Sequence, residues 1–182
     1  MEKATQPRAF YGSFFHAPEY GSFEYLERAL IEVGEDGAIE RVIAHDDPDQ
    51  AAAVAKAREA GALYELGEGK FGLPGFVDIH VHSPQWPQAA LALDEPLYRW
   101  LDERTFPLES KFADVDFAKE VYSDLVDQLL ARGSTTAVYL GSAHLEATVA
   151  LAEICAERGQ RALVGKTVMD DPQANPEYYR DA

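Results

Sequence analysis

The sequence predicts an α/β fold, in which a β-rich lead-in over residues 1–70 precedes a parallel sheet with helices over residues 71–182. Strand-type and helix-type segments alternate after the lead-in, and this alternation is typical of β–α–β units. Two histidines, His80 and His82, stand near the end of the first strand of this alternation. These observations favour the α/β class and direct attention to one edge of the sheet.

The lead-in carries strand-type residues on both sides of a turn. Residues 9–15 and 28–33 are rich in aromatic and aliphatic side chains, and residues 34–37 supply a turn. Residues 38–43 then alternate as a returning strand, which predicts a hairpin. Alanine dominates residues 50–60, so a helix is expected there.

A glycine-rich turn over residues 67–72 leads to a short apolar strand over residues 76–82, predicted to be buried. Side chains of a strand alternate between faces, so the imidazoles of His80 and His82 should point the same way, ~6.5 Å apart along the strand. Two nitrogen donors on one face can hold a divalent metal such as zinc. A chance His-x-His pair is the alternative, although each buried imidazole would then need a hydrogen-bond partner.

The remaining chain continues the alternation of helices and strands. An amphipathic pattern, β-branched runs and flanking glycines predict helix, strand, helix and strand over residues 115–132, 134–140, 144–158 and 161–169. Either Asp114 or Asp116 can cap the first of these helices. Cys155 is expected to pack in the core, and His144 either begins its helix or faces a site.

Residues 83–108 are predicted to be mostly loop and short helix, and a long loop after a strand usually serves a site. Trp100 and Phe106 are expected to pack this loop, whereas packing and a site role are equally open for Trp86. The side-chain amide of Gln85 offers a donor and an acceptor to a ligand, although a lone glutamine is by default a surface residue.

Composition limits the classes of function. The formal net charge of −16 and a pI near 4.6 argue against DNA or RNA as a partner. Cys155 is the single cysteine, which excludes an internal disulfide and a cysteine-cluster zinc site. We see neither a signal peptide nor an apolar run near the ~20 residues of a membrane span, so a cytoplasmic protein without a membrane partner is expected.

The stretch Pro74-Gly75-Phe76-Val77-Asp78-Ile79-His80-Val81-His82 resembles the first barrel strand of the amidohydrolase superfamily. Three further stretches extend the likeness to the guanine deaminase family, at residues 82–85, 100–107 and 165–170. This resemblance implies a (β/α)8 barrel preceded by part of a β-sandwich. Residues 1–70 would be the partial β-sandwich and residues 71–182 the first three β/α units. A complete barrel typically needs ~250 residues, so we expect the N-terminal portion of a longer enzyme with an incomplete barrel.

The resemblance also implies hydrolysis of guanine to xanthine and ammonia, with one zinc ion per subunit. His80 and His82 would be metal ligands, and Gln85 would contact the purine substrate. The family's other metal ligands and its proton-shuttling carboxylic acids match no stretch of this sequence, so no catalytic residue is assigned and the isolated chain is expected to be inactive. The family does not use a bridging lysine, and Lys166 is therefore interpreted as structural.

Two alternatives remain open. The chain could belong to another amidohydrolase deaminase or chlorohydrolase that acts on a nitrogen heterocycle. It could instead be a short non-catalytic protein that uses a partial barrel for association. Exposed strand edges favour self-association in every case, so a homo-oligomer is compatible with the sequence.

Overall fold

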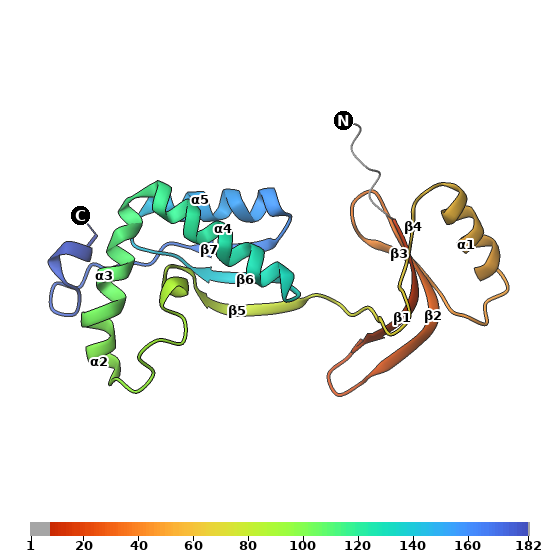
Figure 1. Ribbon diagram of the computed structural model, residues 1–182, viewed down its shortest axis with the longest axis horizontal. Coiled ribbons are helices and arrows are strands. Elements are labelled where there is room, and N and C mark those ends of the chain that lie inside the picture. The colour runs from red at the N-terminus through yellow and green to blue at the C-terminus, as the bar shows by residue number, and fades with distance from the viewer. Residues whose placement is uncertain (1–7, 182) are drawn as a thin grey trace. The chain divides into compact units, whose positions relative to one another are not determined.

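The computed structural model describes residues 8–181, which divide into two compact units. One unit ends at Pro74 and the other begins at Gly75. The first is a four-stranded sheet with a helix, and the second is a three-stranded sheet with helices (Figure 1). Both units combine strands and helices, as the predicted α/β class requires.

The first unit has the strand order β3-β2-β1-β4, in which β4 runs parallel to β1 and the other pairs are antiparallel. Its strands are β1 (Ala9–His16), β2 (Glu24–Val33), β3 (Ile39–Ile43) and β4 (Leu63–Glu65). The predicted hairpin is present as β2 and β3, although β2 begins earlier than residue 28. The three residues of β4 are too few to show alternation, which explains why the sequence does not reveal this strand.

Helix α1 (Gln50–Glu59) covers the core of the first unit. Val54 and Ala57 of this helix pack against Ala9, Leu30 and Ile43 from three strands of the sheet. The helix was expected from its alanine content, and it ends at Glu59, one residue before the predicted end. Its few large side chains leave this core small.

The second unit is a parallel sheet whose order, β5-β6-β7, follows the chain. The strands are β5 (Phe76–His82), β6 (Ser134–Leu140) and β7 (Arg161–Gly165). Helices α4 (Val115–Ala131) and α5 (Leu145–Arg158) connect them and lie together on one face of the sheet (Figure 1). Parallel neighbours need such crossovers, so the predicted alternation of strands and helices is confirmed.

Short helical turns fill the long connection between β5 and α4. They are η1 (Ser83–Gln88), α2 (Leu97–Trp100), the π-helical η2 (Leu101–Thr105), α3 (Phe106–Glu109) and η3 (Ser110–Ala113). Another short turn, η4 (Glu177–Tyr179), follows β7. The predicted loop with short helix is therefore present, with more helix than expected after Leu97.

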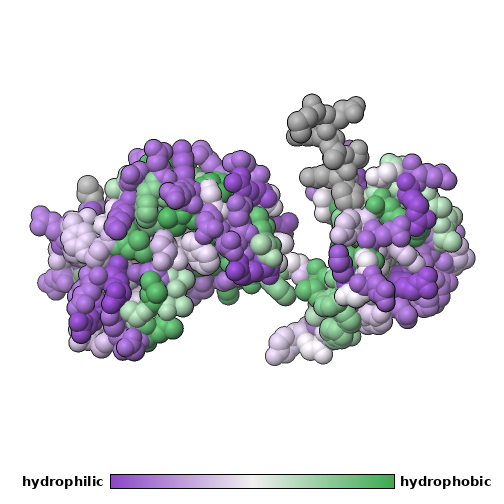
Figure 2. Space-filling model, viewed as in Figure 1, coloured by the Kyte–Doolittle hydropathy of each residue, from purple (hydrophilic) through white to green (hydrophobic). Residues whose placement is uncertain are grey.

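The larger core lies between α4, α5 and the sheet. Its largest fully buried members are aromatic, namely Phe112, Tyr122 and Tyr139. Cys155 is 2% exposed within this core, as predicted. Hydrophilic side chains predominate where these helices face the viewer in Figure 2, with apolar residues showing between them.

The ends of the two long helices have identifiable causes. The carboxylate of Asp114 accepts hydrogen bonds from the backbone N–H groups of Asp116 and Phe117, so Asp114 is the N-cap of α4. Gly159 ends α5 with φ at +73°, a left-handed conformation that glycine adopts without a side-chain penalty.

The prediction that β5 is buried is wrong for this structure. Val77 is 62% exposed and Ile79 is 74% exposed. Strand β5 lies at an edge of the sheet, and α4 and α5 cover only the face that holds Val81, Ala137 and Tyr139. The opposite face, which we call the open face, carries apolar side chains without a covering layer among residues 75–181.

The third parallel strand is shorter than predicted. It ends at Gly165, which is the partner of Leu140 at the end of β6, instead of continuing to Met169. Beyond this point one further backbone bond follows, from the N–H of Thr167 to the carbonyl oxygen of Ser142 at 3.2 Å. The chain turns there, and the Thr167 hydroxyl donates to the carbonyl oxygen of Gly141 at 2.6 Å.

Among the helices of residues 8–181, each is too short or too polar to cross a membrane.

Truncation of the buried Leu151 side chain should destabilise the second unit by about 2–5 kcal/mol, because it removes apolar contacts and leaves a cavity. Both tryptophans, Trp86 and Trp100, lie in this unit, so urea unfolding followed by tryptophan fluorescence reports it selectively. Leu145→Ala at an exposed position of the same helix is the matched control and should cost far less than Leu151→Ala. Equal losses for the two variants would contradict the described core.

Candidate functional site

The polar groups of interest gather at the carboxyl edge of the parallel sheet. His82 ends β5, and its register partner on β6, Leu140, ends the next strand. Ligand sites of α/β folds lie at this edge, because the connections after parallel strands all begin there. The three connections that follow β5, β6 and β7 supply the remaining residues of the site.

The imidazoles of His80 and His82 converge on the open face. Their Nε2 atoms are 3.0 Å apart, and their ring centroids are 5.0 Å apart. Val81 between them packs on the helix-covered face, which is the alternation predicted from the sequence. The pair thus presents two nitrogen atoms to a single point outside the strand.

This geometry fits two ligands of one divalent metal. Bonds of ~2.0–2.1 Å at a tetrahedral angle place two nitrogen donors ~3.3 Å apart, close to the separation found here. Partial burial and the neighbouring His80 lower the pKa of His82, which favours the neutral ligand form. Among residues 8–181 no group of three or more His, Cys, Asp and Glu side chains gathers for a metal, so the pair forms an incomplete coordination set.

A cavity of about 280 Å³ lies beside His82. It is lined by Val81 of β5, by Leu125 of α4 and by the β5–α4 connection, which includes Gln85, Trp86 and Trp100. The Trp86 indole N–H donates to Asp124 of α4 at 2.7 Å, and this bond fixes the ring against the core. Trp86 therefore packs the loop and also forms part of the cavity wall.

Two bonds hold the beginning of this connection in place. The Ser83 hydroxyl donates to the carbonyl oxygen of Leu140 at 3.1 Å, which ties the end of β5 to the end of β6. The amide of Gln88 donates to the Thr105 hydroxyl at 2.8 Å in a buried position. The segment that carries Gln85 is therefore constrained at both of its ends.

Gln85 contacts a buried carboxylate that the sequence does not reveal. Its Nε2 donates to Oε1 of Glu109 at 2.9 Å, and the Tyr179 hydroxyl donates to Oε2 of the same carboxylate at 2.6 Å. Burial and the Glu109 carboxylate raise the pKa of Tyr179 above its ordinary value. The only sequence signal for Glu109 is its position at the end of the apolar Phe106–Glu109 turn, where burial is favoured.

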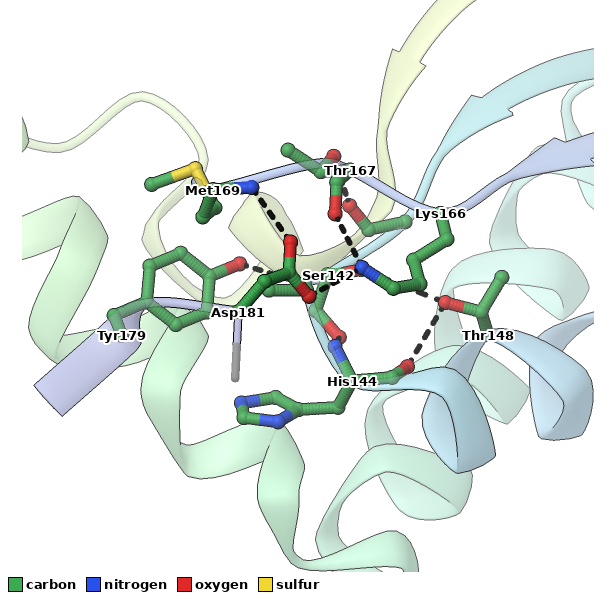
Figure 3. A network of polar contacts seen from close by, with 10 residues as sticks. Ser142, His144, Thr148, Lys166, Thr167, Met169, Tyr179 and Asp181 are labelled. Carbon is green, nitrogen blue, oxygen red and sulfur yellow. Dashed lines mark hydrogen bonds and ion pairs between the residues drawn. The ribbon is translucent and has the colours of Figure 1, made fainter. Parts of the chain in front are cut away.

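A second polar network ties the end of the described chain to the sheet (Figure 3). The Lys166 ammonium donates to Asp181 at 2.6 Å, and Asp181 also accepts from the backbone N–H of Met169 at 2.7 Å. These bonds lower the pKa of Asp181, the bond from Lys166 contributing most. Lys166 thus takes the structural part that was expected of it.

His144 is the N-cap residue of α5, which begins at Leu145 and not at His144. Its ring lies 5.7 Å from that of Tyr179, and its buried Nε2 has no hydrogen-bond partner among the described residues. Burial lowers the pKa of His144. The residue does not join His80 and His82 in a common ligand group.

Residues 71–181 match the Amidohydrolase family, and the chain belongs to that family. The chain is 39% identical over 180 residues to a guanine deaminase of Dictyostelium discoideum, covering 94% of this chain and 39% of that protein. It thus spans about two fifths of the length of this curated relative.

Solved structures agree with this assignment. A guanine deaminase from C. acetobutylicum with bound guanine in its active site superposes with a TM-score of 0.80 at 26% identity, covering 96% of this chain and 39% of that one. A mutant atrazine chlorohydrolase from Arthrobacter aurescens, complexed with zinc and atraton, has a TM-score of 0.72 at 18% identity, covering 94% of this chain and 39% of that one. At that identity the second likeness concerns the fold alone.

Removal of one imidazole should weaken zinc binding by the chain by about one to two orders of magnitude, since even second-shell partners of metals are worth ~10–100-fold. Calorimetric titration with zinc can compare His80→Ala and His82→Ala with the unsubstituted chain. His45→Ala removes an exposed histidine of the first unit and serves as control. Equal zinc affinity in all four proteins would contradict a shared site at His80 and His82.

Proposed function

We propose that this chain supplies the metal-binding strand and part of the substrate pocket of a guanine deaminase, which hydrolyses guanine to xanthine and ammonia. The observation that carries the proposal is the convergence of the His80 and His82 Nε2 atoms, together with a cavity that both His82 and Gln85 line. The 39% identity to a guanine deaminase over nearly the whole chain supports this choice of substrate.

In this proposal His80 and His82 hold one zinc ion per subunit. The separation of their Nε2 atoms suits the metal, and a catalytic zinc usually has three protein ligands. The remaining ligands and the proton-transferring acids would come from the part of the relatives that this chain does not span. A bound zinc ion lowers the pKa of its water ligand toward ~7 and so supplies a nucleophile near neutral pH.

The chain's own residues would bind and orient the purine. Gln85 lies on the cavity wall near His82, so its amide can reach a substrate held there. Trp86 and Trp100 provide apolar surface for the flat ring and exclude water from the cavity. The acidic surface of the protein leaves a neutral purine unaffected, whereas it would repel a nucleic acid.

We further propose that residues 71–182 form the first three β/α units of a (β/α)8 barrel and that residues 1–70 form part of a β-sandwich. The open face of β5, β6 and β7 supports the first assignment, because its exposed Val77, Ile79 and Leu163 would line a barrel interior. The exposed edges of the four-stranded sheet likewise offer pairing positions to further strands.

A chimaera tests the proposed activity. This chain replaces the aligned segment of the Dictyostelium guanine deaminase, and conversion of guanine to xanthine is measured with zinc supplied. The chimaera should turn guanine over, whereas the 182-residue chain alone should not. Gln85→Ala should raise KM for guanine about tenfold, because a hydrogen bond to the substrate is lost.

The same chimaera separates guanine deamination from the alternative heterocycle chemistry. Folding is checked by circular dichroism and metal content by atomic absorption before any activity is compared. A folded, zinc-loaded chimaera that hydrolyses a chlorinated triazine and leaves guanine intact would favour the chlorohydrolase alternative. Loss of guanine turnover with His82→Ala, but not with His45→Ala, is the expected result.

A further inference from the structure

We infer that Glu109 is a positioning residue that fixes the side-chain amide of Gln85, so that the Gln85 carbonyl oxygen faces the ligand and selects a ring that carries an N–H donor. This inference deepens the proposed function and rests on it for the identity of the ligand. It is built on a chain of hydrogen bonds, buried from Ala143 through Tyr179 to Glu109 and partly buried from Glu109 to Gln85.

Glu109 accepts two hydrogen bonds in this chain. Tyr179 accepts the backbone N–H of Ala143 at 3.0 Å, so its own proton is free to be donated onward to Glu109. Oε2 of Glu109 thus accepts from Tyr179, and Oε1 accepts from the Gln85 NH2 group. In this arrangement the Gln85 oxygen is not used by Glu109.

The carboxylate is held rigidly enough to impose this orientation. Glu109 is 6% exposed and Tyr179 is 1% exposed. The Tyr179 ring packs in a small cluster with Ala143, Met169 and Phe106. These contacts join the connections that follow β5, β6 and β7 at a single point, so Glu109 cannot turn away without breaking buried bonds.

The fixed Gln85 amide would distinguish a hydrogen-bond donor from an acceptor on the ligand. With one amide proton committed to Glu109, the Gln85 oxygen keeps both lone pairs for a ligand in the adjoining cavity. Guanine carries N–H donors on its ring and its amino group, and these can donate to the Gln85 oxygen. A ring nitrogen without a proton would instead place its lone pair against the lone pairs of that oxygen. A buried polar mismatch of this kind lowers binding affinity, so the orientation of the Gln85 amide would discriminate between ligands.

The hydrogen bond itself is tested on the 182-residue chain by NMR, without any activity. The side-chain amide protons of Gln85 should exchange with solvent at least about tenfold more slowly than those of the exposed Gln173. Glu109→Gln should abolish this protection, because an amide at position 109 no longer dictates which end of Gln85 it meets. Equal exchange of Gln85 and Gln173 in the unsubstituted chain would overturn the inference.

The effect on binding is tested in the chimaera. Glu109→Gln should raise KM for guanine about tenfold while kcat changes far less. Glu120→Gln, at an exposed carboxylate of α4, should leave both constants unchanged. The double variant Gln85→Glu with Glu109→Gln should recover most of the affinity, since the new amide at position 109 donates to the new carboxylate at position 85.

Failures of the two proposals are distinguishable. An unsubstituted chimaera without guanine turnover speaks against the guanine deaminase function, and the exchange measurement still decides the role of Glu109. If Glu109→Gln prevents folding, Tyr179→Phe removes one donor to Glu109 and should raise KM about threefold. A folded variant at either position with unchanged KM for guanine would refute the positioning role.

Discussion

In the second unit the three strands pair parallel and in chain order, and this pairing determines where every other element lies. Each parallel connection must cross back over the sheet, so α4 and α5 are brought together on one face and bury Tyr122 and Tyr139 between them and the strands. The same pairing places the ends of the strands at one edge. There, residues distant in sequence, such as Gln85 and Tyr179, come to share the carboxylate of Glu109.

The periodicity of apolar residues predicts most of this architecture, because apolar residues recur at the positions that are buried between the strands and the helices. Strand β6 and helices α4 and α5 were expected close to their observed bounds, and Asp114 caps α4 as one of the two candidate aspartates. Periodicity fails for the face of the sheet that no helix of residues 75–181 covers. The apolar run of β5 predicts a buried strand, yet Val77 and Ile79 lie on the open face. An apolar side chain indicates that burial is favourable, and it does not identify the segment that buries it.

The residues of the candidate site also differ in whether the sequence alone reveals them. Local spacing suffices for His80 and His82, because strand alternation alone brings their rings to one side. Gln85 is found through the motif around it. Glu109 and Tyr179 belong to no short motif, and their contact spans 70 residues of sequence. A contact of this separation exists only once the sheet has formed, which is why its members remain hidden until the structure is known.

The proposed pocket would be made selective by groups that need not touch the ligand. A glutamine on a loop could present either end of its amide, and the two orientations differ by little in water. Two tethers, Ser83 to Leu140 and Gln88 to Thr105, first hold the loop at the sheet edge. A buried acceptor then makes one orientation of the amide costly, because an unpaired buried carboxylate oxygen loses its solvation without compensation. In the proposed role of Gln85, selectivity would therefore originate in the burial of Glu109, and the core around Tyr179 keeps that side chain buried.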